Sequence, residues 1–439
     1  MRRALVVVVC CCLLAGAAVA VPSVGDRQSA RPATPVTNTS EYLTIGPDAT
    51  ESTGYQRATL DVSGTLALDT RGLDGRYRQL VLDERFAATD STAKRRELLQ
   101  TNADRIESRI DGLQRRQSTA VREYNNGTRT AREFVIELAR IHTAAGRLGV
   151  AAGRVADRAR SIPGSTIDGQ PAVSWARNRG VELGPLRGPV RERIAMTLRG
   201  QNTAPLDAST APNLEGVEAV PDERLEALDL YVATTSEGVV LATVDDGRHS
   251  REAYLPSERA NDSTGSLTDI TAALDRVADR YPWTWNNSVS RNARGNRQAG
   301  IYRFTLFYDH GRLTTYLDSR SGEVFAEQQR NRLSGIPTAD PIRRTSGDLR
   351  LTINRTYPTG PVELSLVDRT GEPVDGRITI ANHTIGRTGT DGSLWAVAPR
   401  NSATVTARAN GDTVRIETDF SPAGNRTAAN ATAQPTAER

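Results

Sequence analysis

The chain has 439 residues, of which 38% are hydrophobic, 25% charged and 5% aromatic. This length is enough for two to four domains of roughly 100–200 residues each. The formal net charge is only +4, and Lys94 is the single lysine among 56 basic residues. Acidic and basic residues alternate along most of the chain, whereas nucleic-acid-binding proteins concentrate positive charge and interleave it with aromatic residues. The composition therefore argues against a nucleic-acid partner.

Residues 1–24 have the pattern of an export signal. Arg2 and Arg3 precede a long apolar run, and the small-x-small sequence that ends at Ala20 fits a signal-peptide cleavage site. Cleavage would separate Ala20 from Val21. The alternative is an uncleaved anchor, because the run of about 18 residues is near the lower limit for spanning a bilayer. Either way, the rest of the chain is predicted to be extracytoplasmic, either secreted or held by an N-terminal transmembrane segment.

A helical hairpin is predicted over residues 81–164, after a linker and extended arm over residues 25–80. Two series of apolar residues, with alternating spacings of three and four, are separated by the turn Asn125-Asn126-Gly127. Such heptads on two segments joined by a tight turn predict an antiparallel pair of helices. The first series is Leu99, Ala103, Ile106, Ile110, Leu113, Gln117, Ala120 and Tyr124, in which Gln117 is the one polar member. The second is Ala131, Phe134, Leu138, Ile141, Ala145, Leu148, Ala152, Val155, Ala159 and Ile162.

The hairpin also carries excess positive charge. Residues 71–160 include 19 basic and 12 acidic residues, a local net charge of +7. Part of this charge repeats at helical spacing along the second arm and forms a candidate stripe for anionic surfaces: Arg140, Arg147, Arg154 and Arg158. Such a stripe could meet lipid headgroups or acidic wall polymers. The alternative is an ordinary solvated helix face.

An α+β region is predicted over residues 222–330, after a linker over 165–221 that contains a short helix beginning at Pro189. Three β-type runs with hairpin turns are followed by a helix over 267–281 and three further strands, so an antiparallel sheet is expected. The order suggests tandem α-β-β-β units, with a single unit as the alternative. The stretch Thr315–Val324 resembles PepSY-type modules, in which a helix packs on an antiparallel sheet.

The C-terminal part is predicted to be a β-sandwich over residues 348–420, after a linker over 331–347 and before a disordered tail over 421–439. Six short alternating runs with turn residues at their ends indicate this architecture. The segments 371–378 and 389–392 resemble carboxypeptidase regulatory-like and other Ig-like domains, which implies a non-catalytic module. The fold class is thus multidomain: helical hairpin, α+β region and sandwich. The order of these regions along the chain resembles a family of haloarchaeal secreted or envelope proteins. This resemblance implies no particular biochemical activity.

Residues suited to catalysis or metal binding are sparse. All three cysteines lie inside the N-terminal apolar run, and no two of the four histidines have the spacing H-x-x-x-H. Asp309, Asp318 and Glu323 could form a pair of catalytic carboxylates, but all three fall at expected hairpin ends. The aromatic cluster at 281–285 could stack on a ligand or close a core. We therefore predict no catalytic residue, no metal and no cofactor.

Eight N-x-Ser/Thr sequons are candidate glycosylation sites, against about three expected by chance. Polar turns contain Asn and Thr in any case, which is the alternative explanation. The eight asparagines are Asn38, Asn126, Asn261, Asn286, Asn354, Asn382, Asn425 and Asn430.

The expected function is that of a non-enzymatic envelope protein with a structural or adhesive role at the cell surface. Its partner would be an envelope or surface-layer protein, a glycan, or an anionic membrane surface. The alternative is an extracytoplasmic regulatory or sensor module, in which the PepSY-like region docks on a protease or a small ligand. The sequence leaves the oligomeric state open.

Overall fold

The computed structural model describes Asn38 and residues 40–201, 227–259, 267–339, 341–357 and 360–420. The predicted export signal with its predicted cleavage site between Ala20 and Val21, the C-terminal tail and three sequons (Asn261, Asn425 and Asn430) lie outside the described residues. Across the described ranges, none of the helices combines the length and the hydropathy needed to cross a bilayer.

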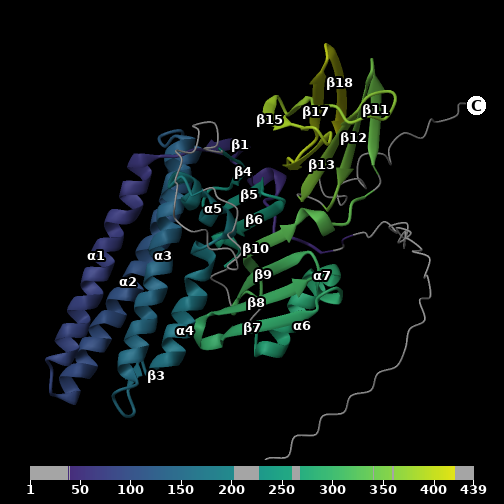
Figure 1. Cartoon of the computed structure of the whole chain (residues 1–439). Coiled ribbons are helices and arrows are strands. Elements are labelled where there is room, and N and C mark those ends of the chain that lie inside the picture. Colours follow the sequence, from purple (N-terminus) through teal and green to yellow (C-terminus); the bar gives the residue numbers. More distant parts are fainter. Residues whose placement is uncertain are drawn as a thin grey trace, which may run out of the picture. The chain divides into compact units, whose positions relative to one another are not determined.

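The predicted hairpin is formed by α2 (Thr92–Asn125) and α3 (Ala131–Ala159), which pack against each other (Figure 1). Every seam residue predicted between Leu99 and Ala120 is buried, as is every one between Phe134 and Ala159. Thr130 and Glu133 form a capping box that begins α3 immediately after the turn. The heptads therefore predicted both helices and their contact.

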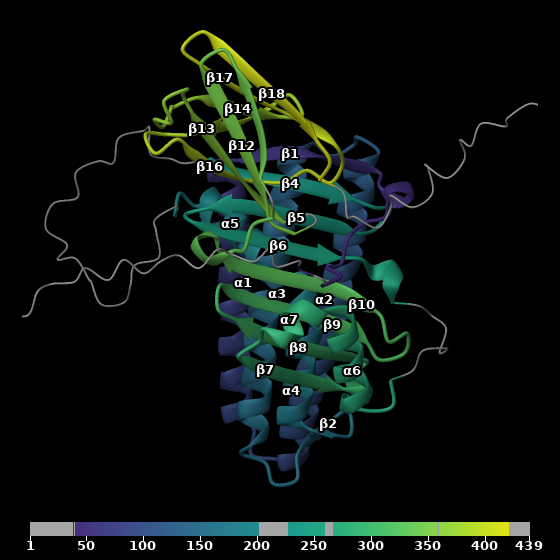
Figure 2. The same cartoon turned by 90° about the vertical axis from the view of Figure 1, so that its right-hand side faces the viewer.

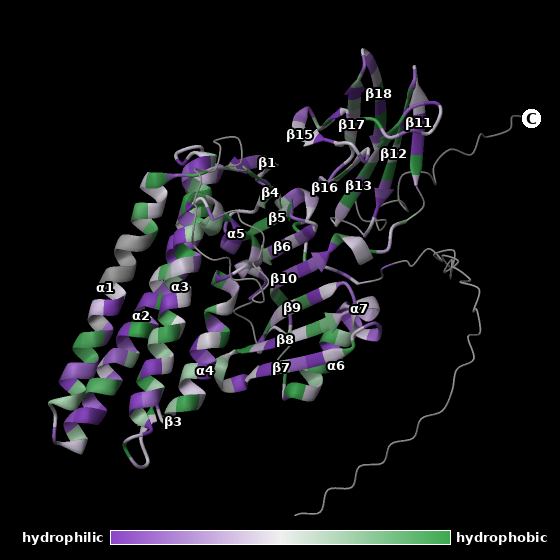
Figure 3. Cartoon of the chain, viewed as in Figure 1, coloured by the Kyte–Doolittle hydropathy of each residue, from purple (hydrophilic) through white to green (hydrophobic). Residues whose placement is uncertain are grey.

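A third long helix, α1 (Val62–Ala87), lies where the sequence predicts a linker and arm. Asp61 caps it by accepting a hydrogen bond from the backbone N–H of Gly64 at 2.9 Å. The helix was missed because its apolar residues do not form one stripe: Leu68 and Phe86 are buried, whereas Tyr77 and Leu80 are exposed. Figure 3 shows this mixture of hydrophobic and hydrophilic residues along α1.

Two shorter helices follow the hairpin. The helix predicted from Pro189 is α5 (Pro189–Leu198). Before it, the sequence predicts only linker, but the structure has a small ribbon of β2 (Thr166–Ile167) and β3 (Gln170–Pro171) and then α4 (Ala172–Glu182). Trp175 anchors α4: it is fully buried and its indole N–H donates to Glu107 of α2 at 2.9 Å. A single buried tryptophan holds this helix in place, whereas predicting a helix from sequence requires a longer series of apolar residues.

An eight-stranded antiparallel sheet forms the α+β region (Figure 2). Its edge strand β1 comes from the predicted arm and pairs with β4 from Ser52–Thr234 to Ala58–Leu228. The opposite edge strand, β7, was not predicted because its sequence is polar throughout. In sheet order the strands are β1 (Ser52–Ala58), β4 (Leu228–Thr234), β5 (Val239–Asp245), β6 (Arg248–Tyr254), β10 (Val324–Arg332), β9 (Gly311–Asp318), β8 (Ile301–Tyr308) and β7 (Ser290–Asn296).

Both faces of this sheet are covered. One face packs on α3 and α5, and the other packs on α6 (Ile270–Arg280), α7 (Pro282–Asn286) and residues 42–45. The sheet contains two groups of three strands, β4-β5-β6 and β10-β9-β8, which are joined where β6 pairs antiparallel with β10. A twofold axis normal to the sheet would relate the two groups in this way. Such an axis keeps equivalent helices on one face, yet α5 and α6 lie on opposite faces. The strands follow the suggested tandem pattern and the helices do not.

The C-terminal region is a β-sandwich of two four-stranded antiparallel sheets, as predicted. Its core is built from alternate aliphatic residues of both sheets, such as Leu351, Leu364, Ile378 and Val405. Two strands were not predicted: β11, which is largely exposed and falls in the expected linker, and the short β15. The sheets are β11 (Ile342–Ser346), β12 (Leu349–Arg355), β13 (Pro361–Val367) and β16 (Ser393–Val397), and β15 (His383–Arg387), β14 (Arg377–Ile380), β17 (Ala403–Ala409) and β18 (Asp412–Thr418).

A buried carboxylate, Glu327 of β10, ties the centre of the large sheet to the segment that covers it. It accepts hydrogen bonds from the backbone N–H of Leu43 at 2.7 Å, Arg251 Nη1 at 3.0 Å, Tyr281 Oη at 3.0 Å and Gln329 Nε2 at 2.6 Å. Arg251 in turn donates to the carbonyl of Leu43. Both charged side chains are almost completely buried, so each needs the other.

Replacing Glu327 by Gln should therefore lower the free energy of unfolding by about 3 kcal/mol, because the Arg251 charge stays buried without its counter-charge. Denaturant unfolding measures the change. The matched control is Glu323→Gln, whose partly exposed side chain pairs with Arg276 at 2.7 Å and should cost less than about 1 kcal/mol. Equal, small losses in both variants would contradict this role for Glu327.

A buried histidine makes stability depend on pH. His249 of β6 is completely buried, and within the described structure neither ring nitrogen has a hydrogen-bond partner. Burial, followed by the Arg251 charge, lowers the pKa of His249 to about 3. The unfolded chain therefore binds a proton on this ring at a higher pH than the native chain does, so stability falls as the pH drops below about 6.5.

For one such group, the free energy of unfolding should fall by about 1.4 kcal/mol per pH unit between about pH 6 and pH 4. The His249→Leu variant should lose that contribution and show a shallower fall than the wild type. Denaturant unfolding at a series of pH values measures the difference. Parallel curves for the two proteins would show that His249 is protonated without cost in the native state.

Candidate functional site: two arginine-lined hollows

The predicted arginine stripe on α3 does not form one surface. Arg140 pairs with Glu137 at 3.7 Å, and Arg158 pairs with Asp83 of α1 at 2.9 Å. Arg147 and Arg154 instead line a large hollow next to α1. The prediction of a continuous stripe did not include α1, and the packing of that helix beside α3 gives Arg158 a partner and places Arg147 and Arg154 in the lining of a cavity.

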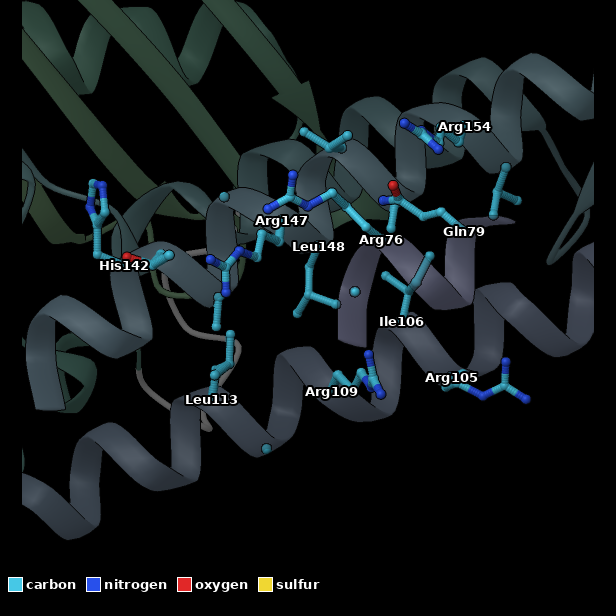
Figure 4. A pocket seen from close by; sticks show the side chains of 18 of the residues that line it. Arg76, Gln79, Arg105, Ile106, Arg109, Leu113, His142, Arg147, Leu148 and Arg154 are labelled. Carbon is cyan, nitrogen blue, oxygen red and sulfur yellow. The ribbon is translucent and has the colours of Figure 1, made fainter. Parts of the chain in front are cut away.

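We call this cavity the helix-side hollow. It measures about 1060 Å³ and is lined by α1, α2, α3 and α5. Figure 4 shows Ile106, Leu113 and Leu148 between α2 and α3, with arginines around them. Among the described residues, the lining includes one acidic residue, Glu192, and seven arginines: Arg76, Arg105, Arg109, Arg116, Arg147, Arg154 and Arg199.

Several of these arginines have partners in the structure. Arg116 forms an ion pair with Glu137, and Arg154 has a weak contact with Asp83 at 4.0 Å. Arg105 donates to the neutral amide of Asn102 at 3.0 Å. Among the lining residues that the structure describes, arginines outnumber acids by seven to one, so an anionic ligand would be attracted into the hollow.

A second cavity, the sheet-side hollow, lies between one face of β7–β10 and the segment that contains α4 and α5. It measures about 290 Å³. Within the part of the chain that the structure describes, its lining again has Glu192 as the one acidic residue, with five arginines: Arg187, Arg294, Arg303, Arg312 and Arg330. Three of them, Arg303, Arg312 and Arg330, lie on β8–β10, whose other residues are mostly buried. Charged residues within such apolar strands are a signal that the sequence itself contains.

Like charges face each other directly in the sheet-side hollow. Arg294 of β7 is the cross-strand partner of Arg303 on β8, and Arg312 of β9 is the partner of Arg330 on β10. Like charges in directly opposed positions destabilise a sheet. Burial and then the nearby Arg330 charge lower the pKa of Arg312. Packing alone does not require this arrangement.

The floor and wall of the sheet-side hollow are held by neutral hydrogen bonds. Gln328 Nε2 donates to the carbonyl of Gly184 at 2.9 Å and also to that of Arg187, which joins β10 to the loop before α5. Thr305 and Thr314 hydrogen-bond across β8 and β9 at 3.2 Å. The arginines therefore project from a fixed frame.

His142 and Glu192 line both hollows. Burial, partly opposed by Glu192 and reinforced by nearby arginines, lowers the pKa of His142 to about 4, so the ring is neutral at neutral pH. Burial alone would raise the pKa of Glu192, but its ion pair with Arg330 outweighs burial and the pKa is lowered. The junction therefore carries one fixed negative charge.

The sequons within the described residues differ in accessibility. Asn126, Asn286 and Asn382 are exposed, at the end of α2, the end of α7 and the β14–β15 turn. The amide of Asn354 donates to Glu363 at 3.0 Å and that of Asn38 to the Tyr42 hydroxyl at 3.1 Å. The first three are therefore better placed to carry a glycan.

The other candidate residues have structural partners. Asp318 accepts from Arg259 at 2.9 Å and organises its own turn, and Glu323 pairs with Arg276. In the aromatic cluster, Tyr281 is fully buried, and Trp283 and Trp285 pack against the core on the α6 side of the sheet. That cluster closes a core, and Asp309 is exposed at a hairpin end.

Three family models match consecutive parts of the chain. Residues 1–203 are similar to a domain of unknown function, DUF7096, and residues 230–337 to a family of unknown function, DUF7094. Residues 340–416 are similar to an archaeal fibronectin-III type-like domain, which agrees with the sandwich and with the predicted archaeal, Ig-like character. Comparison with curated proteins and with solved structures found no significant match.

Proposed function

We propose that the chain is a non-enzymatic envelope protein that binds acidic groups of a surface glycan in its sheet-side hollow. In this proposal the protein is extracytoplasmic, and its role is adhesive or structural. The observation that carries the proposal is the directly opposed pairing of Arg294 with Arg303 and of Arg312 with Arg330. An anion between opposed guanidinium groups replaces their repulsion by charge-assisted hydrogen bonds.

The size and frame of the sheet-side hollow support a sugar acid as the bound group. Its volume of about 290 Å³ is at the lower end of the range for small-molecule pockets, roughly 300–1,000 Å³. The threonine and glutamine side chains on its floor can hydrogen-bond hydroxyl groups, while planar guanidinium groups match carboxylates or sulfates in paired geometry. One acidic unit of a longer chain would fit, with its neighbours outside.

The double variant Arg303→Gln/Arg312→Gln tests this proposal. With a uronic-acid oligosaccharide as the probe, we expect its affinity to fall at least tenfold in calorimetric titration at low salt. The free protein should keep its stability or gain up to about 1 kcal/mol, because cross-strand repulsion is relieved. The control Arg343→Gln/Arg344→Gln removes the same charge from the exposed strand β11 and should bind normally. Equal losses in both variants would indicate non-specific attraction and overturn the proposal.

The alternative function is a regulatory or sensor module that detects a small ligand through the PepSY-like region. The small volume of the sheet-side hollow favours this alternative in one respect, since a single anion would suffice to fill it. The same titration with inorganic phosphate and with the monomeric uronic acid separates the two functions. Tight binding of the small anions with no gain from a longer oligosaccharide would favour the sensor.

Export is part of the proposed function, and it predicts a defined mature N-terminus. The apolar run and the small residues before Val21 support cleavage after Ala20. Mass spectrometry of the protein from an envelope fraction should identify Val21 as its first residue. Peptides that contain Met1 in the same fraction would instead indicate an uncleaved N-terminal anchor.

A further inference from the structure

We propose that the helix-side hollow binds an anionic amphiphile of the lipid class, with a phosphate headgroup held by arginines and a hydrocarbon chain laid between the helices. This inference concerns a different cavity from the glycan proposal and does not rest on it. Its volume of about 1060 Å³ lies at the upper end of the usual range for ligand pockets, which leaves room for a headgroup and a chain.

Glycines from three helices line the helix-side hollow. Gly75 of α1, Gly112 of α2 and Gly146 of α3 all line it. A Cβ atom at Gly75 or Gly112 would meet nothing within 4 Å, and at Gly146 its nearest neighbour would be an arginine side chain at 3.7 Å. Packing does not demand glycine at these positions, although each glycine within a helix costs about 1 kcal/mol relative to alanine. A larger side chain at Gly75 or Gly112 would have open space to enter.

The lining has separate apolar and charged parts. Leu82, Ile106, Leu113, Leu148 and Val155 belong to the core between the three long helices and also face the hollow. A hydrocarbon chain against them would extend that core and release water from apolar surface. Guanidinium groups in the lining, such as that of Arg105, suit a phosphate, because the planar fork of arginine matches phosphate geometry.

The lining also discriminates against other anionic ligands. It is built from helices, whose interior backbone groups are already paired, so the N–H and C=O groups of an acidic peptide would find few backbone partners. The lining residues that the structure describes include no Phe, Tyr or Trp, so the site lacks the large aromatic side chains on which nucleotide bases usually stack. A hydrocarbon chain requires neither kind of partner.

Dodecyl phosphate, used below its critical micelle concentration, is a suitable probe for the full-length protein. Gly112→Phe places a large side chain in the hollow and, because phenylalanine favours helix more than glycine does, should preserve helicity by circular dichroism. We expect its affinity for dodecyl phosphate to fall at least tenfold in calorimetric titration. The control is Gly153→Phe on α3, where an added Cβ would also meet nothing within 4 Å but which does not line the hollow; its affinity should stay that of the wild type.

Two further measurements separate the headgroup from the chain. Arg105→Gln should weaken dodecyl phosphate binding several-fold and leave binding of the neutral amphiphile dodecyl maltoside unchanged. Inorganic phosphate alone should bind at least tenfold more weakly than dodecyl phosphate. The proposal is overturned if inorganic phosphate binds as tightly as dodecyl phosphate, if a cationic dodecyl amphiphile binds equally well, or if Gly112→Phe retains wild-type affinity.

Discussion

The large sheet depends on two buried ion pairs, one on each face at its centre. On one face, Glu327 of β10 holds Arg251 of β6 and the backbone of Leu43. On the other, Glu252 of β6 pairs with Arg191 of α5 at 2.7 Å and also accepts from the backbone N–H of Val190 at 3.2 Å. Removing one partner of such a pair leaves the other charge buried and unpaired, which lowers the free energy of unfolding strongly. These contacts therefore fix which helix and which segment cover each face.

Regular apolar spacing was enough to predict the hairpin and six strands of the sandwich, because those elements bury one continuous stripe or face. The helix α5 was predicted from the proline at which it begins. Apolar spacing failed for α1, α4 and the edge strands β1 and β7, whose positions are set by distant partners. Gln117 illustrates the difference. It is the one polar residue of the first heptad series, and its carbonyl oxygen accepts from the buried Arg191 at 2.7 Å, a contact that no local pattern contains.

The same limit applies to the candidate sites. Helical spacing identified Arg147 and Arg154, but their role as cavity lining follows from α1, which spacing did not predict. The opposed arginines of β7–β10 lie on strands that are consecutive in the chain, but which arginine faces which is decided by strand register. The two hollows converge on His142 and Glu192, so a charge bound in one changes the field in the other, and binding at the two sites should be thermodynamically linked.

The pairing of β1 with β4 has a consequence for the order of assembly. Ser52–Ala58 meets Leu228–Thr234, so the chain of the three long helices is inserted between two neighbouring strands of one sheet. Contacts within the α2–α3 hairpin are local and form quickly, whereas closing so long a loop is slow. During synthesis the helices would therefore emerge and pair first. The strand β1 would remain unpaired until its partner β4 has left the ribosome.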